Sequence, residues 1–202
     1  MEKRYSEKEI SVFNGVLSLC KEGKKIYNIT VQEIATAANM GKGTLYEYFS
    51  SKEDIIINAV VYFLWQDTAA AQEISAMDIP FKSKVFRLYD LLLNSIDNGF
   101  AMISRLVISG DVVDIPQLIS RHSEYVQCAV AKRNSIIMDI LHSGEKEGVI
   151  SLEFDREYIK MAIKANLGCI ACCQQVSQCN ESVCQIEQKK ETAYTLLLKS
   201  LN

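Results

Sequence analysis

The sequence predicts an all-α protein of about nine helices, in which a small N-terminal domain of three helices precedes a larger helical domain. Only two prolines, Pro80 and Pro116, occur in 202 residues, and proline is the residue that most strongly interrupts helices. Apolar residues recur at helical spacing, and no segment shows the sustained alternation that strands require. Hydrophobic residues make up 49% of the chain, which is enough for a sizeable core.

Apolar periodicity and helix-ending residues predict the order of the elements. A first helix is expected at 6–24, with Gly23 as its stop, and a fourth at 52–73. In the larger domain Gly148 is expected to end a helix, and Asp155 is expected to cap the next one. The five helices of this domain are expected at residues 81–98, 100–109, 116–147, 155–178 and 181–201.

Two short segments between the first and fourth helices form a helix-turn-helix pattern. Thr30 can cap the first of them, with Glu33 three residues later at the capping-box spacing, and Asn39 stands where the chain must turn. The second carries Leu45 and Phe49 on one face, because residues four apart are neighbours on a helix. Its opposite face has a cation, a hydroxyl and two phenols, which suit the major groove of DNA: Lys42, Thr44, Tyr46 and Tyr48.

Together, the segments Thr30–Ala35, Gly41–Phe49 and Ser51–Glu53 resemble the DNA-binding region of the TetR family of bacterial transcriptional regulators. The family pattern usually has Gly at position 39 and often Ser at 41, where this chain has Asn39 and Gly41. Asn tolerates left-handed backbone better than most residues, whereas Gly41 has no hydroxyl for capping or phosphate binding. The resemblance implies a helix-turn-helix DNA-binding domain at 1–52, a helical effector-binding and dimerisation domain at 53–202, and a homodimer formed by the last two helices.

Bulk charge does not support DNA binding in the N-terminal region. Residues 1–60 carry eight Lys or Arg and eight Asp or Glu, whereas nucleic-acid-binding domains are usually more basic. The prediction of DNA binding therefore depends on the positions of individual side chains. Side chains expected to reach base edges are Lys42, Thr44 and Gln32; those expected to hold phosphates are Thr30, Tyr46, Tyr48 and Lys52, and Gly43 allows close approach of the backbone.

Two further sets of residues are predicted in the larger domain. Aromatic and methionine side chains from several helices suit an apolar effector and suit a plain core equally: Phe86, Tyr89, Phe100, Met102, Tyr125, Met138 and Met161. A dimer interface is expected on the last two helices, at Cys169, Cys172, Cys173, Ala193, Leu196, Leu197 and Leu201. The apolar stripe of the final helix could also be intrachain core.

The seven cysteines permit two interpretations. Cys169, Cys172 and Cys173 share one helix face, where they can pack as small apolar residues or serve as a thiol or metal sensor. Metal sites usually combine two clusters or nearby histidines, and His122 and His142 are distant in sequence. The N-terminus has no signal-peptide pattern, so reduced thiols and a cytoplasmic location are expected.

The function predicted from these observations is that of a ligand-responsive transcriptional regulator. A homodimeric repressor would bind a palindromic double-stranded DNA operator and leave it when a small, largely apolar effector binds. The sequence offers no glycine-rich phosphate loop or nucleophile elbow, so no catalytic residue, metal or cofactor is assigned and an enzyme is not expected. The longest apolar stretch, Ile55–Trp65, is too short to cross a membrane. The alternatives are a cysteine-based redox or metal sensor on the same scaffold and a helical protein-interaction module.

Overall fold

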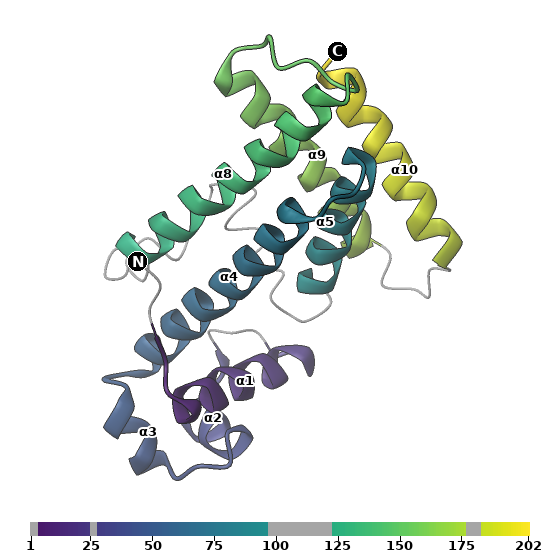
Figure 1. Cartoon of the computed structure of the whole chain (residues 1–202). Coiled ribbons are helices and arrows are strands. Elements are labelled where there is room, and N and C mark those ends of the chain that lie inside the picture. The colour runs from purple at the N-terminus through teal and green to yellow at the C-terminus, as the bar shows by residue number, and fades with distance from the viewer. Residues whose placement is uncertain (1–3, 25–27, 97–122, 177–182) are drawn as a thin grey trace.

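Figure 1 shows the computed structural model of the chain, which describes residues 4–24, 28–96, 123–176 and 183–202. Within these ranges the chain forms eight α-helices and no strand, which confirms the all-α prediction. The expected helix at 100–109 and the expected helix start at Pro116 lie outside the described residues. The helices are α1 Glu7–Lys21, α2 Val31–Ala37, α3 Lys42–Tyr48, α4 Lys52–Ala76, α5 Phe81–Ser95, α8 Ser123–Lys146, α9 Arg156–Val176 and α10 Val183–Ser200.

Four helices, α1, α2, α4 and α9, begin at capping side chains that the sequence makes recognisable, and at the start of α4 Ser51 Oγ accepts from Asp54 N–H at 3.1 Å. Ser6 and Thr30 each form a complete capping box, with Glu9 and Glu33 respectively, at the starts of α1 and α2. Asp155 accepts the backbone N–H groups of residues 157 and 158 at 2.9 Å, which confirms its predicted role at the start of α9. Local sequence therefore determines where these helices begin.

Three helices also end in the same hydrogen-bonded turn, with a residue in the left-handed conformation just after the helix. These residues are Gly23 with φ 85°, Asn39 with φ 53° and Gly148 with φ 68°. After α2, Asn39 N–H donates to Thr36 O (3.1 Å) and Met40 N–H donates to Ala35 O (2.9 Å), as a Schellman motif requires. The predicted stops at Gly23 and Gly148 are confirmed, and Asn39 makes the turn of the helix-turn-helix.

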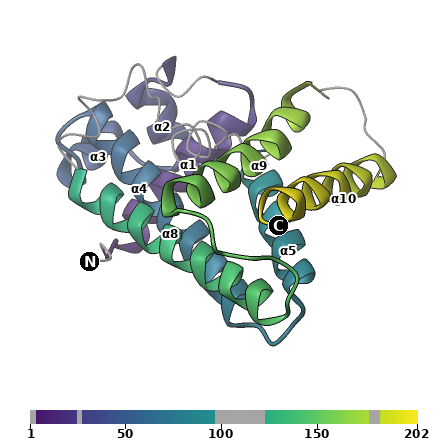
Figure 2. The ribbon, with the colours of Figure 1, turned by 90° about the horizontal axis from the view of Figure 1, so that it is seen from above.

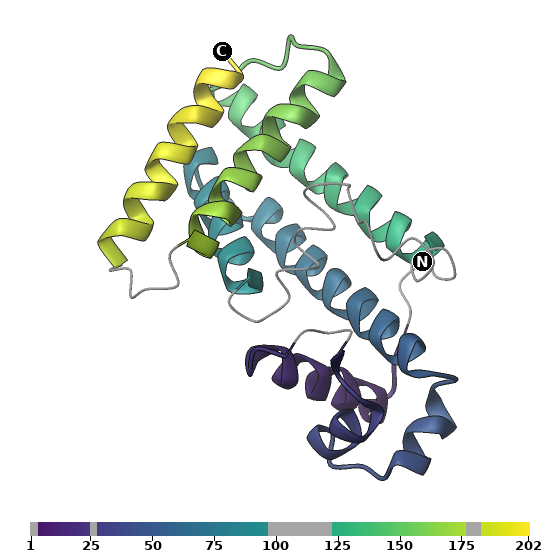
Figure 3. The same ribbon diagram turned by 180° about the vertical axis from the view of Figure 1, so that it is seen from behind.

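The long helix α4 carries two hydrophobic cores, one near each end. The N-terminal core combines α1, α2, α3 and the first part of α4 up to Leu64, and Ala129 of α8 also belongs to it. The C-terminal core begins at Ala71 on α4 and includes buried side chains of α5, α8, α9 and α10. Figure 3 shows α1, α2 and α3 gathered at one end of α4 and α9 and α10 at the other. Two helices, α4 and α8, therefore belong to both cores.

The C-terminal helices are joined by a buried polar chain as well as by apolar packing. Tyr89 of α5 donates its hydroxyl to Asn166 Oδ1 of α9 at 2.6 Å, and Asn166 Nδ2 donates to Ala193 O of α10 at 2.6 Å. Burial raises the pKa of Tyr89, so its hydroxyl stays a donor. Figure 2 shows α9 and α10 as neighbours on the side of α5. In the described part of the chain, no helix is both long enough and apolar enough to cross a membrane.

Candidate functional site

The short helix α3 is held by its apolar face and leaves its polar face open. Leu45 is fully buried and Phe49, just after the helix, is nearly so, and both belong to the N-terminal core. Gly41 precedes the helix and makes no side-chain cap, as its lack of a hydroxyl requires. On the outer side Tyr46 is 49% exposed and Tyr48 is 37% exposed. Large exposed aromatic side chains beside a cation are available to a partner rather than to the core.

The structure brings the predicted DNA-contacting residues to one end of the molecule. They come from the start of α2, from α3 and from the start of α4, which lie together at the lower end in Figure 1. Thr44 and Lys52 are partly exposed. The other six are exposed: Thr30, Gln32, Lys42, Gly43, Tyr46 and Tyr48.

Two of these residues, Thr30 and Tyr48, already have contacts within the chain. The Thr30 hydroxyl donates to Glu33 Oε2 at 2.8 Å and accepts from Glu33 N–H at 3.2 Å, so the capping box already occupies it. Hydrogen bonds from Lys24 and then from Thr30 lower the pKa of Glu33 to about 2. Lys8 of α1 lies 5.7 Å from the centre of the Tyr48 ring, which adds a cation beside the polar face of α3.

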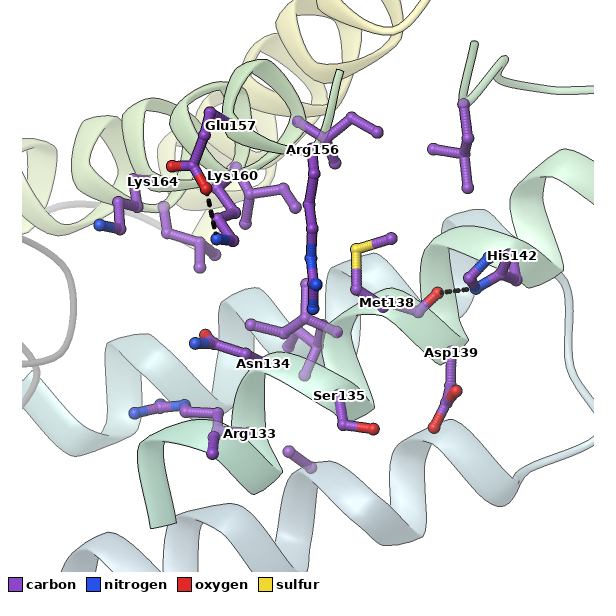
Figure 4. A pocket seen from close by; sticks show the side chains of 18 of the residues that line it. Arg133, Asn134, Ser135, Met138, Asp139, His142, Arg156, Glu157, Lys160 and Lys164 are labelled. Atoms are coloured by element: carbon purple, nitrogen blue, oxygen red, sulfur yellow. Dashed lines mark hydrogen bonds and ion pairs between the residues drawn. The ribbon is translucent and has the colours of Figure 1, made fainter. Parts of the chain in front are cut away.

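A pocket of about 900 Å³ lies in the larger domain, between α4, α5, α8 and α9. Its volume is within the range of ligand sites in proteins. The apolar part of its wall comes from all four helices: Ala71, Leu88, Leu91, Leu92, Ile137, Met138, Ile159, Ile163 and Leu167. Figure 4 shows the polar side chains, with Arg156 of α9 extending between α9 and α8.

Cations exceed carboxylates among the side chains that line this pocket. Glu157 is paired with Lys160 at 2.6 Å, and Asp139 is the other carboxylate. Arg133, Arg156 and Lys164 form no ion pair with the described residues. The pocket therefore combines a large apolar wall with an excess of positive charge.

The predicted effector residues are distributed over several environments. Of the seven, Met138 lines the pocket, while Tyr89 is buried in the polar chain described above. Phe86 packs against the Tyr194 ring at 5.9 Å, Tyr125 is half-buried on α8, and Met161 is 69% exposed. Phe100 and Met102 lie outside the described residues.

Sequence reasoning missed the charged lining of the pocket, although a signal for it exists. Arg156, Lys160 and Lys164 recur every four residues and alternate with Ile159, Ile163 and Leu167. Residues four apart lie on one face of a helix, so this pattern places a cationic row beside an apolar row. A plain core helix would not need such a row.

The residues predicted for the dimer interface divide into two groups. Ala193, Leu197 and Leu201 are buried in the chain's own C-terminal core, as the alternative interpretation of that stripe expected. Leu196 is 47% exposed and is available to a second copy, and Cys169 is also at the surface. Cys172 and Cys173 lie on α9, but their side chains are outside the description. The described residues contain no group of three or more His, Cys, Asp or Glu that could hold a metal.

Comparison with known proteins supports the resemblance seen in the sequence. Residues 26–59 match the family model described as bacterial regulatory proteins, tetR family. No curated protein sequence matches the chain. The chain is similar in structure to the fatty acid degradation regulator FadR from Bacillus halodurans, with 17% identity over 97% of both chains and a TM-score of 0.73.

Two further solved structures share this fold. One is the transcriptional regulator FadR from Bacillus subtilis in complex with stearoyl-CoA, with 19% identity over 96% of this chain and 99% of that one and a TM-score of 0.69. The other is a putative TetR-family regulator from Vibrio parahaemolyticus, with 18% identity over 94% and 98% and a TM-score of 0.65.

Residues 26–59 thus resemble the DNA-binding region of the TetR family, and the fold of the chain is that of TetR-family transcriptional regulators. The family model and the three solved structures are all of regulators, which is the class of protein that the sequence predicts.

Proposed function

We propose that this protein is a ligand-responsive transcriptional repressor, released from a palindromic operator when a largely apolar effector that carries an anionic group binds the pocket between α4, α5, α8 and α9. The observation that carries the proposal is the position of that pocket. Ala71 lines it, and Ala71 belongs to α4, the helix whose other end packs with the helix-turn-helix. Such a regulator would work in the cytoplasm, where its operator is.

In the proposed complex, residues 1–52 form the DNA-binding domain and α3 enters the major groove. Lys42, Thr44 and Gln32 would reach base edges, while Tyr46, Tyr48, Lys52 and the start of α2 at Thr30 would face phosphates. Gly43 has no atom within 4 Å of the position a Cβ would take, so the backbone has room to approach DNA there. Two copies related by a two-fold axis would read half-sites about 34–36 Å apart.

The proposed dimer uses residues 53–202, with α9 and α10 of each copy at the interface. Support comes from the exposed Leu196 of α10 and from Cys169 of α9, since apolar side chains left at the surface favour association. Ala193, Leu197 and Leu201 would act in this interface only by holding α10 in place, because they are already buried.

The proposed class of effector follows from the lining of the pocket. Apolar side chains from four helices suit a hydrocarbon chain, and the cations that form no ion pair with the described residues suit a carboxylate or phosphate. The regulator from Bacillus subtilis with the same fold was solved in complex with stearoyl-CoA, which has both features. A fatty acyl thioester or a related amphiphilic anion is therefore the proposed effector.

A salt titration of DNA binding tests the first half of the proposal. Double-stranded operators would be selected from a random pool with the full-length protein, and affinity measured by fluorescence anisotropy at several salt concentrations. Lys52→Ala should weaken binding to all sequences and reduce the salt slope by about one unit per protomer, because one phosphate contact is lost. Lys42→Ala should instead relax the preference at one base pair by about 1–3 kcal/mol.

The control is Lys199→Ala, which removes an exposed lysine of α10 far from the helix-turn-helix and should change neither property. Wild-type slope and wild-type base preference in both test variants would show that α3 does not read DNA. The second half of the proposal is tested by adding stearoyl-CoA to the operator complex, where release of DNA is the expected result. Tight binding of stearoyl-CoA without any change in operator affinity would contradict it.

A further inference from the structure

One cation of the pocket is half-buried and has a nitrogen atom that is shielded from solvent. Arg133 lines the pocket from α8, and its Nη1 nitrogen is shielded from solvent and donates no hydrogen bond to the described residues. A guanidinium is always charged and has five N–H groups to satisfy. Leaving one such nitrogen buried and unpaired is unfavourable, so the site is suited to an acceptor that the chain itself does not provide.

The carboxylate that acts on the pKa of Arg133 does not satisfy this nitrogen. The negative charge of Asp67 on α4 acts to raise the pKa of Arg133, but the two side chains form no ion pair, and Asp67 Oδ2 accepts from Ser95 Oγ at 2.8 Å. Burial raises the pKa of Asp67, against the opposing effects of Ser95 and Arg133, and burial lowers the pKa of Arg133. Both side chains have therefore lost hydration on burial, and the attraction between their charges does not fully compensate for that loss.

The neighbours of Arg133 in the pocket also favour an anion. In Figure 4 the side chains of Arg133 and Asn134 from α8 extend to the side away from His142, and Lys164 of α9 lies on that same side. The apolar residues Leu88 and Ile163 line the pocket as well. A ligand with a charged end and a hydrocarbon chain could thus place its charge at Arg133 and its chain against the apolar wall.

We propose that the Arg133 guanidinium is the anion-binding group of this pocket and that it makes the protein select amphiphiles with a carboxylate or phosphate over neutral molecules of the same length. This inference deepens the proposed function, because it assumes that the pocket is the effector site. An anion at Arg133 would compete with Asp67, which lies one helical turn before the pocket-lining Ala71 on α4. A charged ligand would in this way change the interactions of α4, the helix that leads to the helix-turn-helix.

The test compares three ligands with the same C12 chain: dodecanoate, dodecyl phosphate and 1-dodecanol. Their affinities for the full-length protein are measured by isothermal titration calorimetry below their critical micelle concentrations. The wild-type protein should bind at least one of the two anions about tenfold or more tighter than 1-dodecanol. The two anionic arms show whether a carboxylate or a phosphate is preferred. Equal affinity for all three ligands, or no binding of either anion, would overturn the proposal.

Arg133→Gln should weaken binding of the preferred anion by about tenfold to a hundredfold and leave 1-dodecanol within about threefold. Two matched variants identify the residue. Arg87→Gln removes an exposed arginine of α5 that does not line the pocket, and it should change nothing. Arg156→Gln removes the other pocket arginine, and a loss of anion preference there but not in Arg133→Gln would overturn the assignment.

Asp67→Asn provides a test with the opposite sign, and it does not depend on the folding of Arg133→Gln. It removes the carboxylate that competes with the ligand and keeps an oxygen to accept from Ser95, so anion binding should become several-fold tighter. Unchanged or weaker anion binding would show that Arg133 only serves Asp67 as a structural partner. Operator binding is also measured for the same proteins without ligand, to separate the proposed function from the proposed role of Arg133. Absence of operator binding by the wild-type protein would refute the proposed regulator. Equal anion binding by Arg133→Gln and wild type would refute only the role of Arg133.

Discussion

The turn between α2 and α3 should be sensitive to the residue at position 39. Three helices of this chain end in a Schellman motif, and the left-handed position is Gly in two of them and Asn39 in the third. A left-handed conformation costs an ordinary L-residue about 1–2 kcal/mol, and Asn pays less than most because its short polar side chain can bond locally. With φ at 53°, Asn39 lies in that region.

Asn39→Ala should therefore destabilise the protein by about 1 kcal/mol, and Asn39→Gly should be neutral or stabilising by about 0.5 kcal/mol. For a chain of this size a loss of 1 kcal/mol lowers the melting temperature by about 2–4 °C. The measurement is urea denaturation followed by circular dichroism, with the midpoint shifting and the slope unchanged. Operator affinity should fall with Asn39→Ala, because the same turn sets the angle between α2 and α3.

The matched control is the same substitution in right-handed backbone. Asn14 is an exposed residue within α1, where Ala is the better helix former, so Asn14→Ala should raise stability by a few tenths of a kcal/mol. The two Asn→Ala substitutions are thus expected to have opposite signs. A stabilising effect of Asn39→Ala equal to that of Asn14→Ala would refute the argument from backbone conformation.

Three other properties can be tested in the same way. Hydrogen bonds from Lys24 and from Thr30 lower the pKa of Glu33 from 4.5 to about 2, so the contribution of Glu33 to stability should be present above about pH 4.5 and disappear as the pH falls toward 2. Glu33→Gln should make the urea midpoint less dependent on pH across that window. The same pH dependence in the variant and the wild type would contradict this. Leu196→Glu should weaken the proposed dimer about tenfold or more in sedimentation experiments without unfolding it, and an unchanged dissociation constant would exclude α10 from the interface. The fluorescence emission of Trp65, the only tryptophan, should shift when stearoyl-CoA binds. Operator DNA should oppose this shift, because linkage between two binding sites is reciprocal. A shift that operator DNA leaves unchanged would contradict coupling between the pocket and the DNA-binding domain.

Features that depend on neighbouring residues could be predicted from the sequence. The capping box at Thr30, the stops at Gly23 and Gly148 and the turn at Asn39 each result from side chains or backbone preferences within a few positions. The apolar pair Leu45 and Phe49 indicated the inner face of α3 for the same reason. These local signals were sufficient for the class of fold and for the helix-turn-helix.

The pocket and the environment of α10 could not be predicted in this way. The pocket exists because four helices far apart in the sequence meet around it, and nothing in the sequence near Arg133 indicates that its Nη1 has no partner among the described residues. Periodicity likewise showed that one face of α10 is apolar, but a second copy and the chain's own core would bury such a face equally well. Leu197 and Leu201 proved to be intrachain core, and Leu196 is exposed.

The arrangement of α4 and α8 explains why a change in the pocket would be felt at the helix-turn-helix. Ala129 of α8 lies in the N-terminal core, whereas Ile136 and Ile140, two and three turns later, lie in the C-terminal core. A ligand that separates α8 from α5 or α9 must therefore move or bend a helix that also packs on α4 and contributes Ala129 to the N-terminal core. With 25 residues α4 is about 37 Å long, so a tilt of about 5° would displace its far end by about 3 Å. In a dimer that must match half-sites one turn of DNA apart, opposite displacements of this size in the two copies would take both recognition helices out of register, and a few kcal/mol of differential affinity would be enough to release the operator.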